Sequence, residues 1–467
     1  ATEHRYYAYY LMDLKLETKD YKAKCVLTKL YDKTCYNRDG NDVEQPMYGG
    51  VFKALDVVTG EEIPKGNAYL TVPMMKQALI DELYGNPAKG IAGVGATGKQ
   101  VLYLDYTNLY SVHIPDAGEM NEMKSLLNPN CLIYFPERTC YKMDNYVQKT
   151  QSGDYRACGN VVITDRQPFY APYKITVPAE NYASYTREIT IPANGKVAQA
   201  TLVLPFTLEV TDGVHTNEDG LCSFKVSKMT PENCLALDEG EYASALSYRG
   251  KAKFDLITET HTEANVPYMV EVMNAPTDEN ISFIAKQKGS DIMATKGSAM
   301  DATDYTFSGE TATGKIGATT YNFHNYGSYA GKKIDRAAKK VFYFAKNMYL
   351  SSTNLRPELP YVYVYPFRAY YEYSSAGAPA KLFSFWATLD EEFGMPTGIT
   401  DTNAVPDLAI VPGEGSLTAS AREATVVKVY GSNGVMVWSV SLDRGETQTV
   451  TLPGGLYVVN GKKIIVK

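Results

Sequence analysis

Apolar and polar residues alternate with a period of two along most of the chain, a pattern typical of half-buried β-strands. Arg5–Glu17 and Lys22–Tyr31 are expected to form the first strands. From Gln167 onward, strand-like segments follow one another with Gly, Asn, Asp or Pro turns between them, which favours sandwiches or barrels. We predict a mainly β protein with tandem β-sandwich-like domains and a few short helices. The clearest later strands are Tyr173–Pro178, Ala198–Val210, Met269–Met273, Ile281–Lys286, Lys340–Ala345 and Tyr361–Tyr373.

Two segments break this alternation and predict helices. Pro73–Tyr84 places a proline in its first turn, and Met75, Ala78 and Leu79 share one face at helical spacing. Asp116–Leu127 is shorter and amphipathic.

Composition narrows the class of protein. The net charge is −7 with no basic stripe, so nucleic acid is not an expected partner. The longest apolar runs, such as Ala200–Phe206, are far shorter than the roughly 20 residues of a membrane helix, and we do not expect an integral membrane protein. The polar start Ala1–Arg5 is not typical of a signal peptide, so a mature or trimmed form of the chain is expected. Tyrosine is abundant, at 38 residues, as in surface-exposed β proteins.

The seven cysteines leave two alternatives open. Most lie close to another cysteine in the sequence, and an exported protein could oxidise such pairs; buried reduced thiols explain them equally well. The sequence-local pairs are Cys25/Cys35, Cys131/Cys140 and Cys222/Cys234, with Cys158 left over.

The C-terminal segment Glu446–Lys467 predicts a small β-module. Asn460 and Gly461 lie between two apolar runs, and this dipeptide favours the positive φ angles of a tight hairpin turn. A second turn is expected at Pro453–Gly455. The expected strands are Gln448–Leu452, Leu456–Val459 and Lys462–Val466.

The sequence of this module resembles the C-terminal sorting domain of type IX secretion cargo in the Bacteroidetes, over about Pro406–Lys467. The resemblance implies an immunoglobulin-like sandwich that the secretion machinery reads, commonly followed by cleavage and attachment to surface polysaccharide. It also implies a secreted or outer-surface location. The residues that would form the sorting motif are Gly454, Gly455, Tyr457, Gly461, Lys462, Lys463 and Lys467.

A second resemblance covers roughly residues 125–390. Four segments follow in an order that is similar to a block in large Bacteroidales surface proteins, where it often follows leucine-rich repeats. The resemblance implies a β-rich surface module. The usual repeat array is not expected in this chain, where Gln100–Ile114 offers at most one degenerate unit. The four segments are Asn128–Phe135, Asp165–Tyr173, Tyr185–Phe206 and Val364–Tyr370.

At 467 residues the chain exceeds one ordinary core, and its length suggests about three domains. We predict an N-terminal β-rich domain at 1–90, a small α+β segment at 99–165 and a β-sandwich-like surface domain at 166–390. A linker is expected at 391–405, before the immunoglobulin-like sorting-type domain at 406–467.

Catalytic and cofactor motifs are not expected. Gly93–Gln100 matches a phosphate-loop pattern, but a loop precedes it, a strand follows it, and Gln100 replaces the hydroxyl that would bind Mg²⁺. No GxSxG elbow occurs, and the chain is predicted not to be an enzyme. The histidines lie in different segments and are expected at the surface or in turns: His4, His113, His215, His261 and His324.

Two acidic loops, Asn37–Asp42 and Asp212–Asp219, offer several oxygen ligands. Solvated turns explain them best, because Asp, Asn and Gly are the usual turn residues. Calcium, which accepts irregular oxygen-rich loops, is the alternative, and otherwise no cofactor is expected.

Aromatic runs are the best binding candidates. Tyr361, Tyr363 and Tyr365 should lie on one face of a strand, with Val362 and Val364 on the other. Such a row could stack on sugar rings or a partner strand, or it could be an ordinary ladder across a sheet. Further rings come from Tyr6, Tyr7, Tyr9, Tyr10, Tyr370 and Tyr371.

Together these features predict a non-enzymatic exported surface protein, adhesin-like or structural, whose C-terminal domain directs secretion and anchoring. The expected partners are the secretion machinery and surface polysaccharide, with glycans or host or neighbouring-cell proteins as ligands. The alternatives are a glycan-binding module of a nutrient-capture system and a secreted hydrolase, which would need a nucleophile–base pair or paired carboxylates in a pocket.

Overall fold

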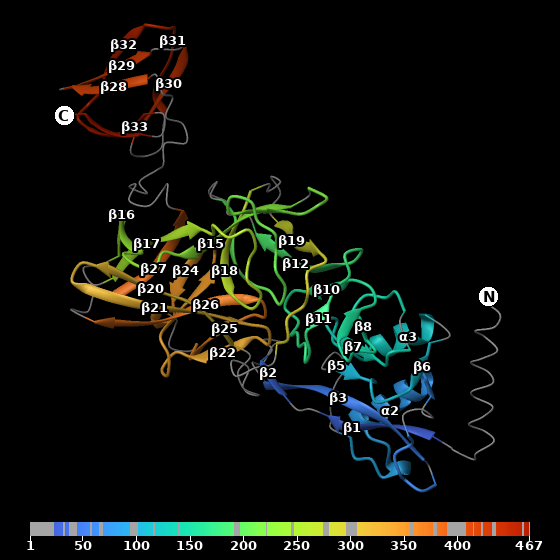
Figure 1. Cartoon of the computed structure of the whole chain (residues 1–467). Coiled ribbons are helices and arrows are strands. Elements are labelled where there is room, and N and C mark those ends of the chain that lie inside the picture. The colour runs from blue at the N-terminus through green and yellow to red at the C-terminus, as the bar shows by residue number, and fades with distance from the viewer. Residues whose placement is uncertain are drawn as a thin grey trace. The chain divides into compact units, whose positions relative to one another are not determined.

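The structure is a computed structural model of the chain (Figure 1). The described residues are 23–30, 33–36, 44–56, 58–64, 69–93, 101–114, 117–138, 141–190, 197–220, 222–243, 247–273, 280–295, 306–354, 359–376, 381–389, 408–413, 415–421, 424–431, 436–459 and 462–466. The predicted first strand, Arg5–Glu17, and the predicted linker lie outside them.

The fold is mainly β with several sheets, as predicted. The chain splits into two compact units, of which the first comprises Ala1–Leu237 and Ala243–Phe393. The second comprises Gly394–Lys467 and the short segment Asp238–Tyr242. No helix in the described ranges has both the length and the apolar character needed to cross a membrane.

An eight-stranded sheet forms the N-terminal part of the first unit. Its central strands β3, β5, β7 and β8 run parallel to one another, whereas β1 and β2 pair antiparallel with β3, and β9 pairs antiparallel with β8. Strand β3 precedes residues 90–99 in the sequence and β5 follows them, yet the two strands pair in the same sheet. The strands are β1 (Ala23–Leu30), β2 (Lys33–Tyr36), β3 (Glu44–Asp56), β5 (Val101–Asp105), β7 (Leu132–Phe135), β8 (Tyr146–Lys149), β9 (Tyr155–Ala157) and β11 (Ile175–Thr176), with the separate pair β4 (Tyr69–Thr71) and β6 (Ser111–His113).

Two helices accompany this sheet. The predicted helix at Pro73–Tyr84 is confirmed as α2 (Val72–Tyr84), and Met75, Ala78 and Leu79 are all buried. Gly85 ends the helix with φ 85°, a conformation that favours glycine. The second predicted helix is α3 (Ala117–Lys124).

Buried asparagines connect the strand stack to the next sheet. The side-chain amide of Asn145 donates to the Val162 carbonyl at 2.9 Å, and its oxygen accepts from the Val162 amide at 2.8 Å. Asn130 makes the same two-way contact with Thr164, at 2.9 and 2.7 Å. Because a buried backbone group without a partner is costly, these side chains satisfy the β10 edge as a strand would.

The larger sheet of the first unit has twelve strands. Although β13 lies at one end of the strand order, it packs against β21 and β26 near the other end, so the sheet curls back on itself. The strands are β13 (Gln199–Val203), β14 (Val214–Thr216), β15 (Ser223–Met229), β16 (Leu235–Ala243), β17 (Ser247–Leu256), β18 (Pro267–Val272), β20 (Thr306–Ile316), β21 (Thr319–Ser328), β23 (Val341–Ala345), β24 (Met348–Ser351), β26 (Arg368–Ala376) and β27 (Lys381–Leu389).

Two small sheets complete the first unit. One has the order β10 (Val161–Thr164), β12 (Tyr182–Thr190) and β19 (Asn280–Lys288). The other pairs β22 (Lys332–Asp335) with β25 (Tyr361–Val364).

The predicted strand Tyr361–Tyr373 is two strands, β25 and β26, and the single-strand prediction was wrong. The chain turns at Pro366 and Phe367, where Phe367 has φ 65°. Proline cannot donate a ladder hydrogen bond, and the Phe367 amide instead donates to the Ser328 carbonyl at 2.7 Å. The Phe367 ring is fully buried, so the positive φ angle of this residue coincides with the burial of its ring.

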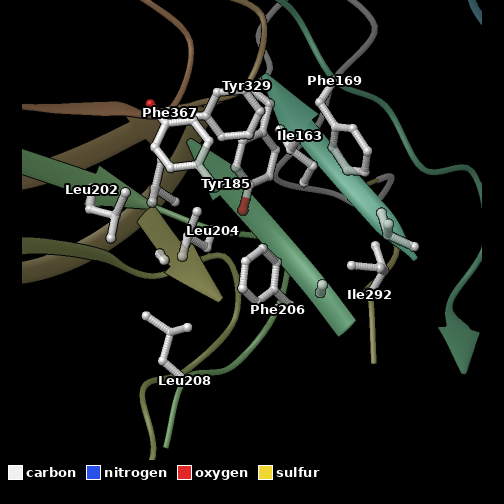
Figure 2. Packing of buried hydrophobic residues seen from close by; sticks show 14 of the residues in the cluster. Ile163, Phe169, Tyr185, Leu202, Leu204, Phe206, Leu208, Ile292, Tyr329 and Phe367 are labelled. Atoms are coloured by element: carbon white, nitrogen blue, oxygen red, sulfur yellow. The ribbon is translucent and has the colours of Figure 1, made fainter. Parts of the chain in front are cut away.

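That ring lies in the largest apolar core, which is drawn in Figure 2. Its centroid is 4.9 Å from the Tyr185 ring and 5.3 Å from the Tyr329 ring, and Phe169 packs beside them. Phe169, Tyr185 and Phe367 come from segments that are far apart in the sequence, and this shared core brings them together.

A largely buried ion pair lies at the same place. Arg368 donates from both Nη atoms to the two Asp165 oxygens, each at 2.8 Å, and also to the Tyr185 hydroxyl at 2.7 Å. Tyr185 in turn donates to Asp165 at 2.6 Å. Burial alone would raise the pKa of Asp165, but the hydrogen bonds and charge of Arg368 outweigh it and the pKa lies below its ordinary value.

The second unit is a β-sandwich with a core of its own. The predicted C-terminal strands are confirmed as β32, β33 and β34, and the strand order is that of an immunoglobulin-like sandwich whose fourth strand joins the second sheet. One sheet contains β28 (Leu408–Gly413), β29 (Ser416–Ala421) and β32 (Thr447–Thr451); the other contains β31 (Met436–Leu442), β30 (Thr425–Gly431), β33 (Gly455–Val459) and β34 (Lys462–Val466).

For one cysteine pair the structure decides between the two alternatives. Cys222 and Cys234 are free thiols, buried in separate core clusters. Burial raises the pKa of the Cys234 thiol to about 12, so this thiol is protonated at neutral pH. The pairs Cys25/Cys35 and Cys131/Cys140 include positions outside the described side chains.

Arg368→Met should destabilise the first unit by about 3–5 kcal/mol, because the largely buried Asp165 carboxylate would lose both guanidinium hydrogen bonds and keep only the Tyr185 hydroxyl and the more distant Arg166, at 3.9 Å. The chain has two tryptophans, Trp386 in the first unit and Trp438 in the second. In a Trp438→Phe background, urea unfolding followed by Trp386 fluorescence therefore reports on the first unit.

Arg156→Met is the matched control, since its ion pair is exposed and should change stability by less than about 1 kcal/mol. The free energies of unfolding of Arg368→Met and the parent should become more similar as the pH falls below about 4, the unfolded pKa of aspartate. Protonation then removes the Asp165 charge. Equal effects of the two substitutions would refute the central role of the buried pair.

Candidate functional site

The best candidate is the outward face of β25. Tyr361, Tyr363 and Tyr365 are half-buried, whereas Val362 and Val364 are only 3% and 5% exposed, so the predicted alternation is confirmed. β25 pairs in antiparallel register with β22.

The two valines anchor this hairpin to the larger sheet. They pack with Ile334 of β22 against Val341 and Tyr370, in one apolar cluster. Because the inner side of β25 is fixed in this way, the backbone that carries the outer tyrosines is held in place, and part of each tyrosine side chain stays exposed.

Basic side chains lie against the rings. Lys333 Nζ is 4.3 Å from the centre of the Tyr361 ring, and the Arg166 guanidinium is 5.1 Å from that of Tyr365. The rings of Tyr363 and Tyr365 meet edge to face at 4.8 Å. We call these five residues the tyrosine face. It combines flat apolar rings with hydroxyls and two cations, a mixture that suits a sugar chain or an anionic polymer.

The buried ion pair between Asp165 and Arg368 lies close in sequence to both partners of the contact between Arg166 and Tyr365. Arg166 directly follows Asp165, and Tyr365 lies three residues before Arg368. Arg166 has φ 59°, a conformation that costs a non-glycine residue about 1–2 kcal/mol. Such local strain often occurs where a side chain must be aimed, and here it accompanies the contact with Tyr365.

Sequence reasoning did not identify Arg166 or Lys333 as members of this face, because both are brought there by long-range packing. It was wrong about Tyr370 and Tyr371, which are 1% exposed and belong to two different cores. The run Tyr6, Tyr7, Tyr9 and Tyr10 lies outside the described residues.

A serine–histidine pair bears on the hydrolase alternative. Ser308 Oγ is 2.6 Å from His324 Nε2, and Nδ1 is 2.9 Å from the Tyr326 hydroxyl. A catalytic triad places a carboxylate at that last position to stabilise the imidazolium. Glu372 faces His324 across the ladder, but its carboxylate is paired with Lys339 at 2.7 Å. A β-bulge after Ser308 brings this pair together, and no sequence motif marks it.

His215 is not a surface histidine, so the prediction was wrong for this residue. It is 2% exposed; Nδ1 lies 2.7 Å from the Glu209 carbonyl oxygen and Nε2 3.1 Å from Asn217 Oδ1. Its strand, β14, turns this side inward. Of the others, His113 and His261 are exposed and His4 lies outside the described residues.

The acidic loop at Asp212–Asp219 directs charge to lysines. Glu218 pairs with Lys288 at 2.8 Å, and Asp219 lies 3.8 Å from Lys286. Within the part of the chain that is described, no group of three or more His, Cys, Asp or Glu side chains is placed to hold a metal ion. Asn37–Asp42, the other loop considered for calcium, and most of Gly93–Gln100 lie outside it.

The sorting-type motif lies at the end of the second unit. Tyr457 is 8% exposed and its hydroxyl donates to the Pro453 carbonyl at 2.8 Å, so it closes the turn that contains Gly454. Gly455 begins β33, while Lys462 and Lys463 begin β34. Gly461 and Lys467 lie outside the described residues.

Comparison with known proteins gives no identification: the chain matches no family model and no curated protein.

We predict that a fluorophosphonate probe leaves Ser308 unlabelled in the folded full chain, because a neutral tyrosine faces Nδ1 of its histidine. Intact-mass and peptide mass spectrometry would detect the adduct. Labelling of Ser308 that disappears in His324→Gln would instead support the hydrolase alternative.

Proposed function

We propose that this chain is a non-enzymatic exported protein of the outer cell surface, adhesin-like or structural, which binds its partner through the tyrosine face. The observation that carries the proposal is the set of half-exposed rings of Tyr361, Tyr363 and Tyr365, held by a hairpin whose inner side is buried. Tyrosine is enriched where proteins bind, because the ring offers a large contact area at a low entropy cost.

The two cations give the face a preferred partner. Lys333 and Arg166 add positive charge beside the uncharged tyrosine rings. An anionic surface polymer or an acidic protein segment would therefore gain both stacking and charge contacts. Binding of this kind should weaken as salt is added, since exposed charges are screened.

A glycan-binding module of a nutrient-capture system is the second candidate. Tyrosine rings also stack on neutral sugars, and the same face would serve as the platform. The two functions differ in the ligand, an anionic polymer or a neutral nutrient glycan, and therefore in their dependence on salt.

The second unit is proposed to act as the export and anchoring signal. It has its own core and contains the motif that resembles the type IX sorting domain. Its partners would be the secretion machinery and surface polysaccharide. A separately folded signal can be recognised without disturbing the binding unit.

The triple substitution of Tyr361, Tyr363 and Tyr365 to alanine should reduce binding at least about tenfold, because losing one aromatic hot spot alone costs about 2 kcal/mol. Beads coated with the full chain would be tested on intact Bacteroidales cells and on polysaccharide purified from them. Tyr84→Ala removes a tyrosine that is 49% exposed on α2 and should bind like the parent. Equal binding by the triple variant would exclude the tyrosine face.

Lys462→Glu with Lys463→Glu should retain the protein in the periplasm of a type IX-competent cell, while the parent reaches the surface. Fractionation and external protease would locate each protein. This variant retains the residues of all three C-terminal strands apart from two lysines, whereas ending the chain at Arg444 removes the strands β32, β33 and β34. Lys428→Glu, on β30 of the same sheet, is the control for charge reversal. Surface exposure of both variants would contradict the role of the motif.

A further inference from the structure

A polar cleft of about 330 Å³ lies between the loop after β13, strand β14 and strand β19. Its volume is at the lower end of the range for small-ligand sites. It is separate in sequence and lining from the tyrosine face. The lining residues are Glu209, Thr211, Val214, Thr216, Glu218, Lys286 and Gln287.

The residues beneath the cleft hold its walls together. His215 and Asn217 are each 2% exposed and bonded to one another. His215 contacts the Glu209 carbonyl, while Asn217 donates to the Ile284 carbonyl at 3.0 Å and accepts from the Lys286 amide at 3.2 Å. Two buried polar side chains thus connect the three segments that form the cleft, so its shape is set before any ligand enters.

Several polar groups in the cleft have hydrogen-bonding capacity to spare. Among the described residues, no hydrogen bond or ion pair uses the Glu209 carboxylate, the Thr211 hydroxyl or the amide nitrogen of Gln287. Thr216 accepts from Ser223 at 2.9 Å and keeps its own proton to donate. The cleft therefore offers both acceptors and donors.

The charge of the cleft restricts the ligand. Glu218 is paired with Lys288, and Asp219 lies near Lys286, so these charges largely cancel. The Glu209 carboxylate adds a negative charge, which disfavours phosphates, sulfates and acidic sugars. Hydroxyl groups, which donate to carboxylates and accept from amides and ammonium groups, fit this arrangement.

We propose that this cleft is a binding site for a neutral, hydroxyl-rich ligand, namely the end of an oligosaccharide chain. Glu209 and Thr211 would bind its hydroxyls on one wall, with Gln287 and Lys286 on the other, and Val214 would contact the apolar side of a sugar ring. The inference does not rest on the tyrosine face, whose cations favour anionic partners.

The test is a glycan array with the full chain, carrying neutral and acidic oligosaccharides, followed by titration of each hit in solution. We expect hits among neutral oligosaccharides. The double variant Glu209→Ala/Thr211→Val should bind such a hit at least tenfold more weakly, since it removes two side chains that make no hydrogen bond or ion pair among the described residues. Glu232→Ala, an exposed glutamate outside the cleft, should bind like the parent.

Three results would overturn the inference: no neutral oligosaccharide is bound, the double variant binds as well as the parent, or calcium alone occupies the cleft in isothermal titration. The triple tyrosine variant should bind the cleft ligand normally. A loss of binding in that variant alone would assign the sugar to the tyrosine face, so failure of this inference is distinguishable from failure of the proposed function.

Discussion

The ion pair between Asp165 and Arg368 is the interaction on which the first unit depends. It joins residues separated by 203 positions, at the point where the small β10–β12–β19 sheet meets the curled larger sheet. Tyr185 completes the hydrogen bonding, which a buried charge pair needs to offset its desolvation. Arg187 lies nearby and is 7% exposed, so two cations share one carboxylate. Burial and the adjacent charge of Arg368 lower the pKa of Arg187 to about 10. The same pair lies next in sequence to Arg166 and close to Tyr365, so it also helps to position that contact of the tyrosine face.

Much of the local structure could be predicted because it depends on short-range pattern. The helix at Pro73–Tyr84 follows from one apolar stripe and a proline in the first turn, and the three C-terminal strands follow from the turns between them. The alternation of Tyr361 with Val362 likewise needs only the two-residue period of a strand. Each of these features is decided by residues that are close in sequence.

What could not be predicted depends on contacts between distant segments. The turn at Phe367 replaces a continuous strand because a buried pocket accepts its ring, and that pocket is made by Tyr185 and Tyr329. Tyr370 and Tyr371 look like surface rings but are covered on both sides, by the β22–β25 hairpin and by the inner core. The parallel stack of β3, β5 and β7 has no visible repeat, since its strands are separated by segments of unequal length.

The two candidate surfaces show how one β unit can present opposite chemistries. At the tyrosine face, the inward valines carry the stability, and the outward rings are bordered by lysine and arginine. At the polar cleft, His215 and Asn217 carry the internal hydrogen bonds, and the outward side ends in a carboxylate, hydroxyls and an amide. In both, the residues that fix the backbone differ from those that face outward. Strand alternation makes this division possible, because neighbouring side chains point to opposite sides and can change independently.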